Sequence, residues 1–325
     1  MPLDLSFTGR SVLLTRIGTD TISTIHALLH DGATVTVESA EPPTSVRDLA
    51  DRGLIELCAE AEHTAYDVVM RGATATPPRA GIGAGEVVLV GGGPSDPGLL
   101  TLQGLDAIRA ADVVVHDRLA PLAALSHARA DAEIIDVGKI PRGEFTPQER
   151  INAILLEHAR RGRIVVRLKG GDGFVFGRGG EEAQACRDAG IPVTVVPGIS
   201  SSIAAPALAG IPVTHRDLVQ GFSVVSGHVP PGDPRSTVEW GALARSGTTL
   251  VVLMGVATLA AITAELMAQG LAADTPAAVV ADAGMASMRT VRATLDTIAE
   301  TAAHERIGAP AVAVIGAVAA LDVLA

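Results

Sequence analysis

The sequence is poor in aromatic residues, with five Phe, one Tyr and one Trp among 325 residues. Proteins that bind single-stranded nucleic acid stack the bases on aromatic side chains, so this scarcity argues against that class. A formal net charge of −11 also argues against a broad phosphate-binding surface. It does not exclude an anionic small molecule, because a local basic pocket can outweigh a charge that is spread over the whole surface.

Cysteine is scarce as well. Cys58 and Cys186 lie far apart without the spacing of metal ligands, so the sequence predicts neither a disulfide framework nor a zinc site. The first ten residues lack a basic segment followed by an apolar one, so no signal peptide is expected. No run of about 18 or more apolar residues is free of charges and turn residues, so no transmembrane helix is expected. These absences together predict a soluble, cytoplasmic protein.

Small apolar residues, by contrast, are abundant, and with 48% hydrophobic residues the chain can bury a core of Ala, Val, Leu and Ile. Its length predicts about two domains of ~150 residues. The Pro- and Gly-rich residues 74–85 predict a linker that follows a small α/β unit over residues 1–80. Beyond the linker, short strand-like and helix-like segments alternate, which predicts parallel α/β architecture. A further boundary near residue 200 gives domains over residues 81–199 and 200–325, the latter with an open, mixed sheet.

The first 80 residues contain three strand-like segments, at residues 11–15, 33–38 and 66–70, with helix-like segments between them. This layout resembles half of a Rossmann domain, as in the dehydrogenase domain that some sirohaem synthases carry at their N-terminus. A dinucleotide site needs Gly-x-Gly-x-x-Gly after the first strand, so that the backbone can reach the pyrophosphate. The corresponding loop here, residues 15–21, has Gly18 as its only glycine. We therefore expect a degenerate scaffold that does not bind NAD.

The most distinctive stretch is RIVVRLKGGDGFVFGRGGEE, residues 163–182. Residues 164–168 predict a short buried strand, which is followed by six glycines and then by a helix-like segment from Glu181. So much glycine is entropically costly, and the loop is longer than the usual ~2–6 residues. We interpret it as a place where backbone approaches a small polar ligand, with Asp172 supplying a carboxylate. A surface connection with several turns is the alternative.

Two helix starts are also marked in the sequence. Residues 86–91 predict a strand that opens into GGGPSDPG, in which Pro94 is incompatible with a Rossmann fingerprint. Thr101 is the expected N-cap of the helix that follows. Thr-Pro-Gln-Glu at residues 146–149 predicts a capping box with Pro at the first helical position.

Two charged residues follow predicted strands. Asp117 comes after residues 113–116, and Lys139 comes after residues 134–137. A carboxylate and an amine at strand ends can supply acid–base chemistry. On these residues alone, the plainer interpretation is a solvated charge at the end of each loop.

Four blocks of sequence resemble the tetrapyrrole methylases, in the same order and over a stretch from about residue 87 to the C-terminus. Arg-Leu-Lys-Gly-Gly-Asp-x-Phe-x-Phe-Gly-Arg-Gly-Gly-Glu-Glu is the most specific of them. The four blocks are residues 90–102, 117–119, 167–182 and 197–216. The resemblance implies two α/β domains with S-adenosylmethionine bound in the cleft between them, preceded here by the small Rossmann-like unit. It also implies a homodimer that methylates two ring carbons of uroporphyrinogen III, giving precorrin-2 for sirohaem and cobalamin synthesis.

The resemblance also assigns roles to individual residues. Asp117 and Lys139 match a proton acceptor and a proton donor. Residues that match cofactor-binding positions are Pro94, Gly170, Gly171, Asp172, Val175, Ser200, Ser201, Met254 and Ala283. No metal is implied, because the methyl group of a sulfonium is already activated. The substrate has eight carboxylates, and Arg is suited to bidentate carboxylate recognition. The arginines at motif edges, which are candidate substrate ligands, are Arg118, Arg142, Arg178 and Arg216.

The sequence departs from the family pattern at several positions. Gly173 stands where Pro is usual after Gly-Gly-Asp, and Ile140-Pro141 follows Lys139 where a basic residue is usual. These departures leave two alternatives open. One is a methyltransferase that acts on a later precorrin, and the other is a protein that binds the cofactor or a tetrapyrrole without turnover. A bifunctional methylase–dehydrogenase is disfavoured by the missing N-terminal glycines.

Overall fold

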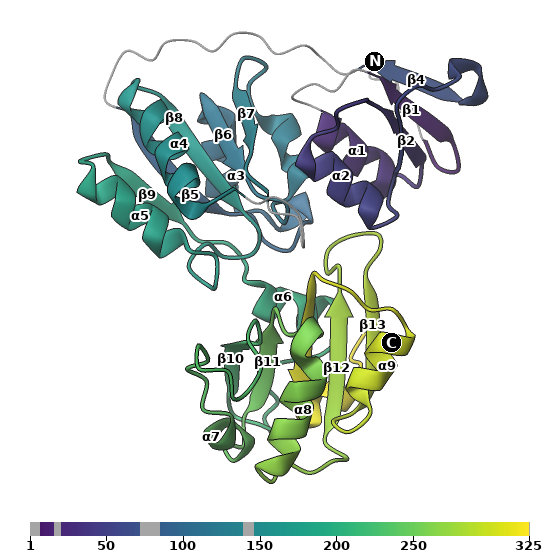
Figure 1. The fold of residues 1–325 in the computed structure, drawn as a ribbon, viewed down its shortest axis with the longest axis vertical. Coiled ribbons are helices and arrows are strands. Elements are labelled where there is room, and N and C mark those ends of the chain that lie inside the picture. The colour runs from purple at the N-terminus through teal and green to yellow at the C-terminus, as the bar shows by residue number, and fades with distance from the viewer. Residues whose placement is uncertain (1–6, 16–20, 72–84, 139–145, 325) are drawn as a thin grey trace. The chain divides into compact units, whose positions relative to one another are not determined.

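The computed structural model describes residues 7–15, 21–71, 85–138 and 146–324 (Figure 1). The chain divides into two compact units, Met1–Ile199 and Ser200–Ala325. The first unit contains two parallel sheets and the second contains one mixed sheet. The α/β fold predicted from the sequence is therefore confirmed. None of the helices in these ranges is both long enough and apolar enough to cross a membrane.

The first sheet belongs to the N-terminal α/β segment, and its four strands are all parallel in the order β3-β2-β1-β4. This is the order of the first four strands of a Rossmann domain, and the resemblance predicted from the sequence is confirmed. The segment comprises β1 (Ser11–Thr15), α1 (Thr21–His30), β2 (Thr34–Glu38), α2 (Thr44–Asp51), β3 (Glu56–Cys58) and β4 (Val68–Arg71). The short edge strand β3 was not predicted, because only three residues form it. The loop that contains Gly18 lies outside the described residues.

The second sheet has five parallel strands in the order β7-β6-β8-β5-β9. Its elements are β5 (Glu86–Gly91), α3 (Leu102–Ala110), β6 (Val113–His116), β7 (Glu133–Asp136), α4 (Gln148–Arg160), β8 (Ile164–Lys169), α5 (Gly179–Asp188) and β9 (Val193–Val196). Alternate residues of each strand point to opposite faces. Val87 and Leu89 accordingly pack with α4 and α5, whereas Val88 and Val90 pack with α3 and with the short helix Leu122–His127.

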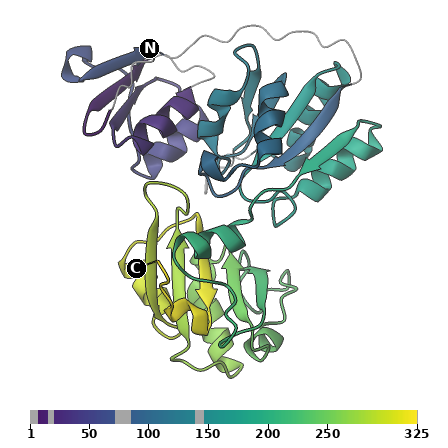
Figure 2. The ribbon, with the colours of Figure 1, turned by 180° about the vertical axis from the view of Figure 1, so that it is seen from behind.

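In the second unit the sheet order is β10-β11-β14-β12-β13, with β10 and β11 parallel and the other neighbours antiparallel. Its strands are β10 (Phe222–Ser226), β11 (Thr249–Leu253), β12 (Pro276–Ala281), β13 (Arg289–Thr294) and β14 (Ala311–Ile315). Its helices are α6 (Ser201–Leu208), α7 (Trp240–Ala244), α8 (Leu259–Ala268) and α9 (Ile298–His304). Helices α8 and α9 cover the face seen in Figure 1, and α6 lies on the opposite face, seen in Figure 2. The mixed sheet predicted for this half is thus confirmed.

The two predicted helix starts had different outcomes. Thr101 caps α3, because its Oγ1 accepts a hydrogen bond from the backbone N–H of Gly104 at 3.0 Å. The capping box at residues 146–149 is wrong, since α4 begins at Gln148 after Pro147 and no side chain caps it. Gln148 is instead buried, and its Nε2 donates to Glu182 Oε1 at 3.2 Å.

Candidate active site

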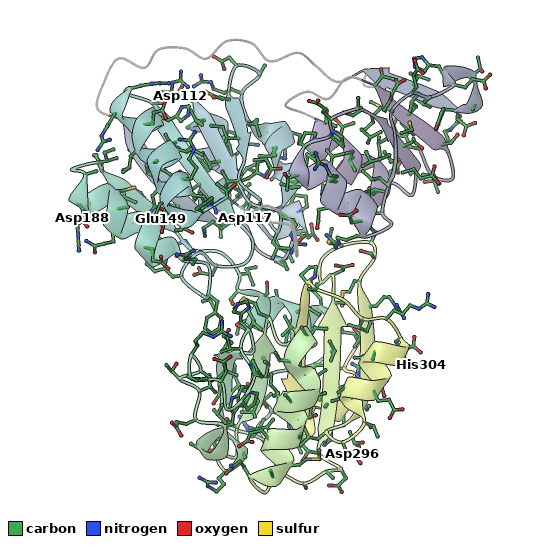
Figure 3. The ribbon with its side chains drawn as sticks, viewed as in Figure 1. Asp112, Asp117, Glu149, Asp188, Asp296 and His304 are labelled. Atoms are coloured by element: carbon green, nitrogen blue, oxygen red, sulfur yellow. The ribbon has the colours of Figure 1, made fainter. Side chains whose placement is uncertain are left out.

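The carboxyl ends of the parallel strands β5, β6, β7 and β8 lie at one edge of the second sheet, where ligands of open α/β sheets usually bind. Asp117 lies at this edge and Asp112 at the opposite end of β6 (Figure 3). The loops after β5 and β8 are bound to each other, because Gly93 and Gly171 exchange two backbone hydrogen bonds of 3.1 and 2.8 Å. This pairing brings the loop of Pro94 beside the loop of Gly170, Gly171 and Asp172.

Glycine is needed where these loops pass one another. A Cβ atom added at Gly170 would meet the carbonyl oxygen of Leu119, in the loop after β6, far inside van der Waals contact. One added at Gly198, after β9, would meet the carbonyl oxygen of Gly171 in the same way. Backbone therefore packs on backbone across these loops. The sequence predicted a close approach of backbone to a small ligand, whereas the atoms approached here belong to the protein.

Asp172 ties two of these loops together. Its Oδ1 accepts a hydrogen bond from the backbone N–H of Phe174 at 2.8 Å, and its Oδ2 accepts one from the N–H of Gly198 at 3.0 Å. Val175 follows in a turn and is partly buried. Gly173, where Pro is usual, faces Lys169, and a Cβ added there would lie 3.2 Å from Lys169 Cδ.

A buried cluster of charges lies behind this edge. Arg167 and Lys169 are two residues apart on β8, so they point to the same face of the sheet, toward Glu182 of α5. Arg167 Nε donates to Glu182 Oε1 at 3.0 Å, and Lys169 Nζ donates to both Glu182 oxygens at 3.1 Å. Glu182 is fully buried and the two cations nearly so. Burial, followed by the nearby Arg167, lowers the pKa of Lys169.

These three residues lie within the glycine-rich motif, but the sequence alone did not predict a role for them. A signal was present, because Arg167 and Lys169 alternate with Val166 and Leu168 in a strand that is otherwise apolar. Charged residues are almost never fully buried unless they are paired, so such a strand requires a buried partner. The sequence does not say which carboxylate that partner is.

The cluster reaches Asp117, the predicted proton acceptor. Arg167 Nη2 donates to Asp117 Oδ2 at 3.4 Å, and the backbone N–H of Leu119 donates to Asp117 Oδ1 at 3.1 Å. The Asp117 side chain is 28% exposed, whereas that of Arg167 is 3% exposed. The carboxylate is therefore held from behind by a buried cation and remains open to solvent in front.

Arg118, a predicted substrate ligand, forms an ion pair within the first unit. Its Nη1 lies 3.1 Å from Asp48 Oδ1 of α2, and the two side chains are 14% and 6% exposed. Burial raises the pKa of Asp48, and the neighbouring Arg118 and Arg52 oppose that rise. Lys139 and Arg142 lie outside the described residues.

The other two candidate arginines are exposed. Arg178 has left-handed backbone, with φ of 59°, and forms a bidentate pair with Glu181 at 2.9 and 2.7 Å. Arg216 lies in the second unit and is exposed to solvent. Neither side chain is buried in the way that Arg118 is.

The remaining predicted cofactor residues belong to the second unit. Ser200 is the N-cap of α6, where its Oγ accepts a hydrogen bond from the N–H of Ser202, and Ser201 begins the helix. Met254 follows β11 with a positive φ of 58° and is 47% exposed, while the half-buried Ala283 follows β12. Both β11 and β12 are antiparallel to β14, so Met254 and Ala283 lie at the same edge of the sheet.

Comparison with known proteins gives a family match over residues 86–299, to the Tetrapyrrole (Corrin/Porphyrin) Methylases. The chain is 47% identical over 234 residues to a uroporphyrinogen-III C-methyltransferase of Priestia megaterium, covering 72% of this chain and 98% of that protein. It is 50% identical over 237 residues to a siroheme synthase of Neisseria meningitidis serogroup B, covering 73% of this chain but only 48% of the relative. The chain thus spans about half the length of such siroheme synthases.

The fold comparison agrees with these matches. The crystal structure of a uroporphyrin-III C-methyl transferase from Thermus thermophilus complexed with S-adenyl homocysteine aligns with a TM-score of 0.61 and 40% identity. The alignment covers 72% of this chain and 98% of the Thermus chain.

Proposed function

The chain belongs to the tetrapyrrole methylases, and we propose that it transfers methyl groups from S-adenosylmethionine to two ring carbons of uroporphyrinogen III, giving precorrin-2. The similarity to the Priestia megaterium enzyme carries this proposal, because it extends over 98% of that enzyme. The product is an intermediate for sirohaem or cobalamin. The resemblance also leads us to propose a homodimer in the cytoplasm, which sedimentation and cell fractionation would test.

The described residues fit the proposed cofactor. A carboxylate oxygen can accept about two hydrogen bonds, and each Asp172 oxygen accepts one in this structure. Asp172 therefore retains the capacity to accept hydrogen bonds from the ammonium group of a methionine moiety. The residues that we propose for cofactor binding are Pro94, Gly170, Gly171, Asp172 and Val175 in the first unit, and Ser200, Ser201, Met254 and Ala283 in the second.

When bound, S-adenosylmethionine supplies a methyl group on a sulfonium, which is activated for transfer without further assistance. What remains for the protein is to align the ring carbon and to remove the proton released there. We assign the proton acceptor to Asp117, whose oxygens are oriented by Arg167 and by the N–H of Leu119. We assign the proton donor to Lys139, which lies outside the described residues.

The substrate's carboxylates require cations that can be reached from solvent. Arg178 and Arg216 are exposed, and we propose them as carboxylate ligands together with Arg142, which lies outside the described residues. Arg178 can exchange its exposed pair with Glu181 for a substrate carboxylate at little cost, since exposed ion pairs contribute at most about 1 kcal/mol. Arg118 also remains a candidate, but its side chain is already paired with Asp48.

The proposal is tested by anaerobic incubation of the full chain with uroporphyrinogen III and S-adenosylmethionine. S-adenosylhomocysteine should accumulate only when the tetrapyrrole is present. Parallel reactions with later precorrins separate the proposed substrate from the alternative of a later pathway step. If S-adenosylmethionine binds but no S-adenosylhomocysteine forms with any of these tetrapyrroles, the proposed activity is wrong.

A further inference from the structure

Two polar contacts of the helix α2 connect the N-terminal α/β segment to the active-site edge of the second sheet. The backbone N–H of Ser45, in the first turn of α2, donates to Asp136 Oδ2 at 2.9 Å. One turn further along, Asp48 forms the 3.1 Å ion pair with Arg118. Both contacts lie within the first unit. Asp136 is the last residue of β7, and Arg118 lies in the loop after the neighbouring strand β6.

Each contact lies beside a residue that we assign to catalysis. Arg118 is bonded in sequence to Asp117. Asp136 Oδ1 accepts a 2.7 Å hydrogen bond from the N–H of Gly138, the residue before Lys139. The N-terminal half of α2 therefore contacts the segment that carries Asp117 and the strand that precedes Lys139 in the sequence.

The Asp48–Arg118 pair is built as a fixed contact. Both side chains are mostly buried, and Arg52, one turn further along α2, lies 3.7 Å from the other Asp48 oxygen. An ion pair withdrawn from solvent is screened less than a surface pair, and removing one partner leaves the other buried and uncompensated. The hydrophobic core also joins the two parts, since α1 packs on the short helix Leu122–His127.

The loop after β6 is thus fixed from three directions. Arg167 holds the Asp117 carboxylate from inside the sheet, and the backbone at Gly170 packs against Leu119. Asp48 holds Arg118 from the N-terminal segment. The family match begins at residue 86, so this third contact comes from a part of the chain outside the matched region.

We propose that Asp48 is a positioning residue for the methyl-transfer reaction, acting through Arg118 on the Asp117 loop, and that the N-terminal segment serves as a clamp on the active-site edge. The inference rests on the function proposed for Asp117. It gives the N-terminal Rossmann-like segment a role that requires no dinucleotide. It also explains why Arg118 faces α2 in this structure.

The test compares Asp48→Asn with Asp51→Asn in the full chain. Asp51 is an exposed residue of the same helix, so its substitution keeps the change in charge and leaves the clamp intact. The backbone amides of Leu119 and Ala120 both donate hydrogen bonds to Asp117. Their hydrogen-exchange rates therefore report on the stability of the loop in the absence of substrate. We expect exchange about tenfold faster in Asp48→Asn, unchanged exchange in Asp51→Asn, and substantial recovery in Asp48→Glu.

Turnover gives the second readout. A displaced Asp117 should lower kcat about tenfold or more in Asp48→Asn, while KM for S-adenosylmethionine stays near that of the unaltered chain. Unchanged exchange at Leu119 and Ala120, or a kcat that rises because Asp48 had been competing with substrate carboxylates, would overturn the inference. If the unaltered chain shows no turnover, the proposed function fails, and the exchange experiment still decides whether the clamp exists.

Discussion

Arg167 donates a hydrogen bond to Asp117 over 3.4 Å, from within a buried strand to a carboxylate at the open edge of the sheet. The same guanidinium donates a hydrogen bond to Glu182, and Glu182 also accepts one from Lys169. A single buried network thus connects the glycine-rich motif to the proposed proton acceptor. Substitutions at Asp117 and at Glu182 separate the chemical role of this network from its structural role.

Asp117→Asn should lower kcat about 100-fold or more, because general-base assistance typically contributes 10²–10⁴-fold. The amide keeps the shape of the side chain and can still accept from Leu119, so cofactor affinity measured by calorimetry should stay unchanged. Asp106→Asn, an exposed carboxylate on α3, is the matched control and should leave kcat unaltered. Full turnover in Asp117→Asn would show that the proton is accepted elsewhere.

Glu182→Gln should lower the free energy of unfolding by about 3 kcal/mol or more, since it removes the buried anion that Arg167 and Lys169 share. Arg167 then keeps its 3.4 Å pair with Asp117. Urea denaturation measures this change. The control is Glu181→Gln, the preceding residue, which pairs with Arg178 at the surface and should cost no more than about 1 kcal/mol. Equal effects from the two substitutions would mean that the buried network does not stabilise the fold.

Gly170→Ala should destabilise the chain by about 1–3 kcal/mol and lower kcat, because the new Cβ pushes against the Leu119 carbonyl next to Asp117. Gly180→Ala is the control, since an added Cβ there meets nothing within 4 Å and Ala favours the helix. Thermal denaturation and steady-state kinetics of both variants test the prediction. A fully active, stable Gly170→Ala variant would contradict the close packing of the two loops.

The buried side chain of His26 should make the stability of the fold depend on pH. Its Nε2 is buried without a hydrogen-bond partner among the described residues, and burial, followed by nearby Arg52, lowers its pKa from 6.5 to about 4. Between these values the unfolded chain binds a proton that the folded chain does not, so stability falls as the pH falls through this window. Once the pH is below both pKa values, the free energy of unfolding is lower by about 3 kcal/mol.

The test compares the unfolding free energy of the unaltered chain with that of His26→Gln at pH 7 and at pH 4.5. Other groups titrate equally in both proteins, so the difference isolates His26. We expect the loss of stability on acidification to be smaller in His26→Gln. Equal losses in the two proteins would indicate that His26 is protonated in the folded state.

Local signals in the sequence were sufficient for much of the fold. The apolar run at residues 164–168 became β8, and Thr101 caps α3 as expected. Local patterns failed where contacts with distant parts of the chain decide the structure. The predicted capping box does not form, because α4 begins after Pro147. Gln148 in its first turn bonds instead to Glu182, a residue 34 positions away. The strand β13 was missed because it is an edge strand without fully buried residues.

The sequence predicted candidate site residues only within the blocks that resemble the tetrapyrrole methylases. The motif located Asp117 and Asp172, but their partners depend on how distant segments meet. The pairing of Asp48 with Arg118 joins residues 70 positions apart, and neither has a periodic or spacing signal that points to the other. Such contacts follow from packing of α2 on the sheet edge, which the linear pattern does not encode.

The mass of the tetrapyrrole formed from uroporphyrinogen III tests the central claim most directly. The full chain, incubated anaerobically with this substrate and methyl-labelled S-adenosylmethionine, should give a product that carries two labelled methyl groups, and Asp117→Asn should give far less of it. Recovery of the substrate without any added methyl group, although the chain binds S-adenosylmethionine, would contradict the account.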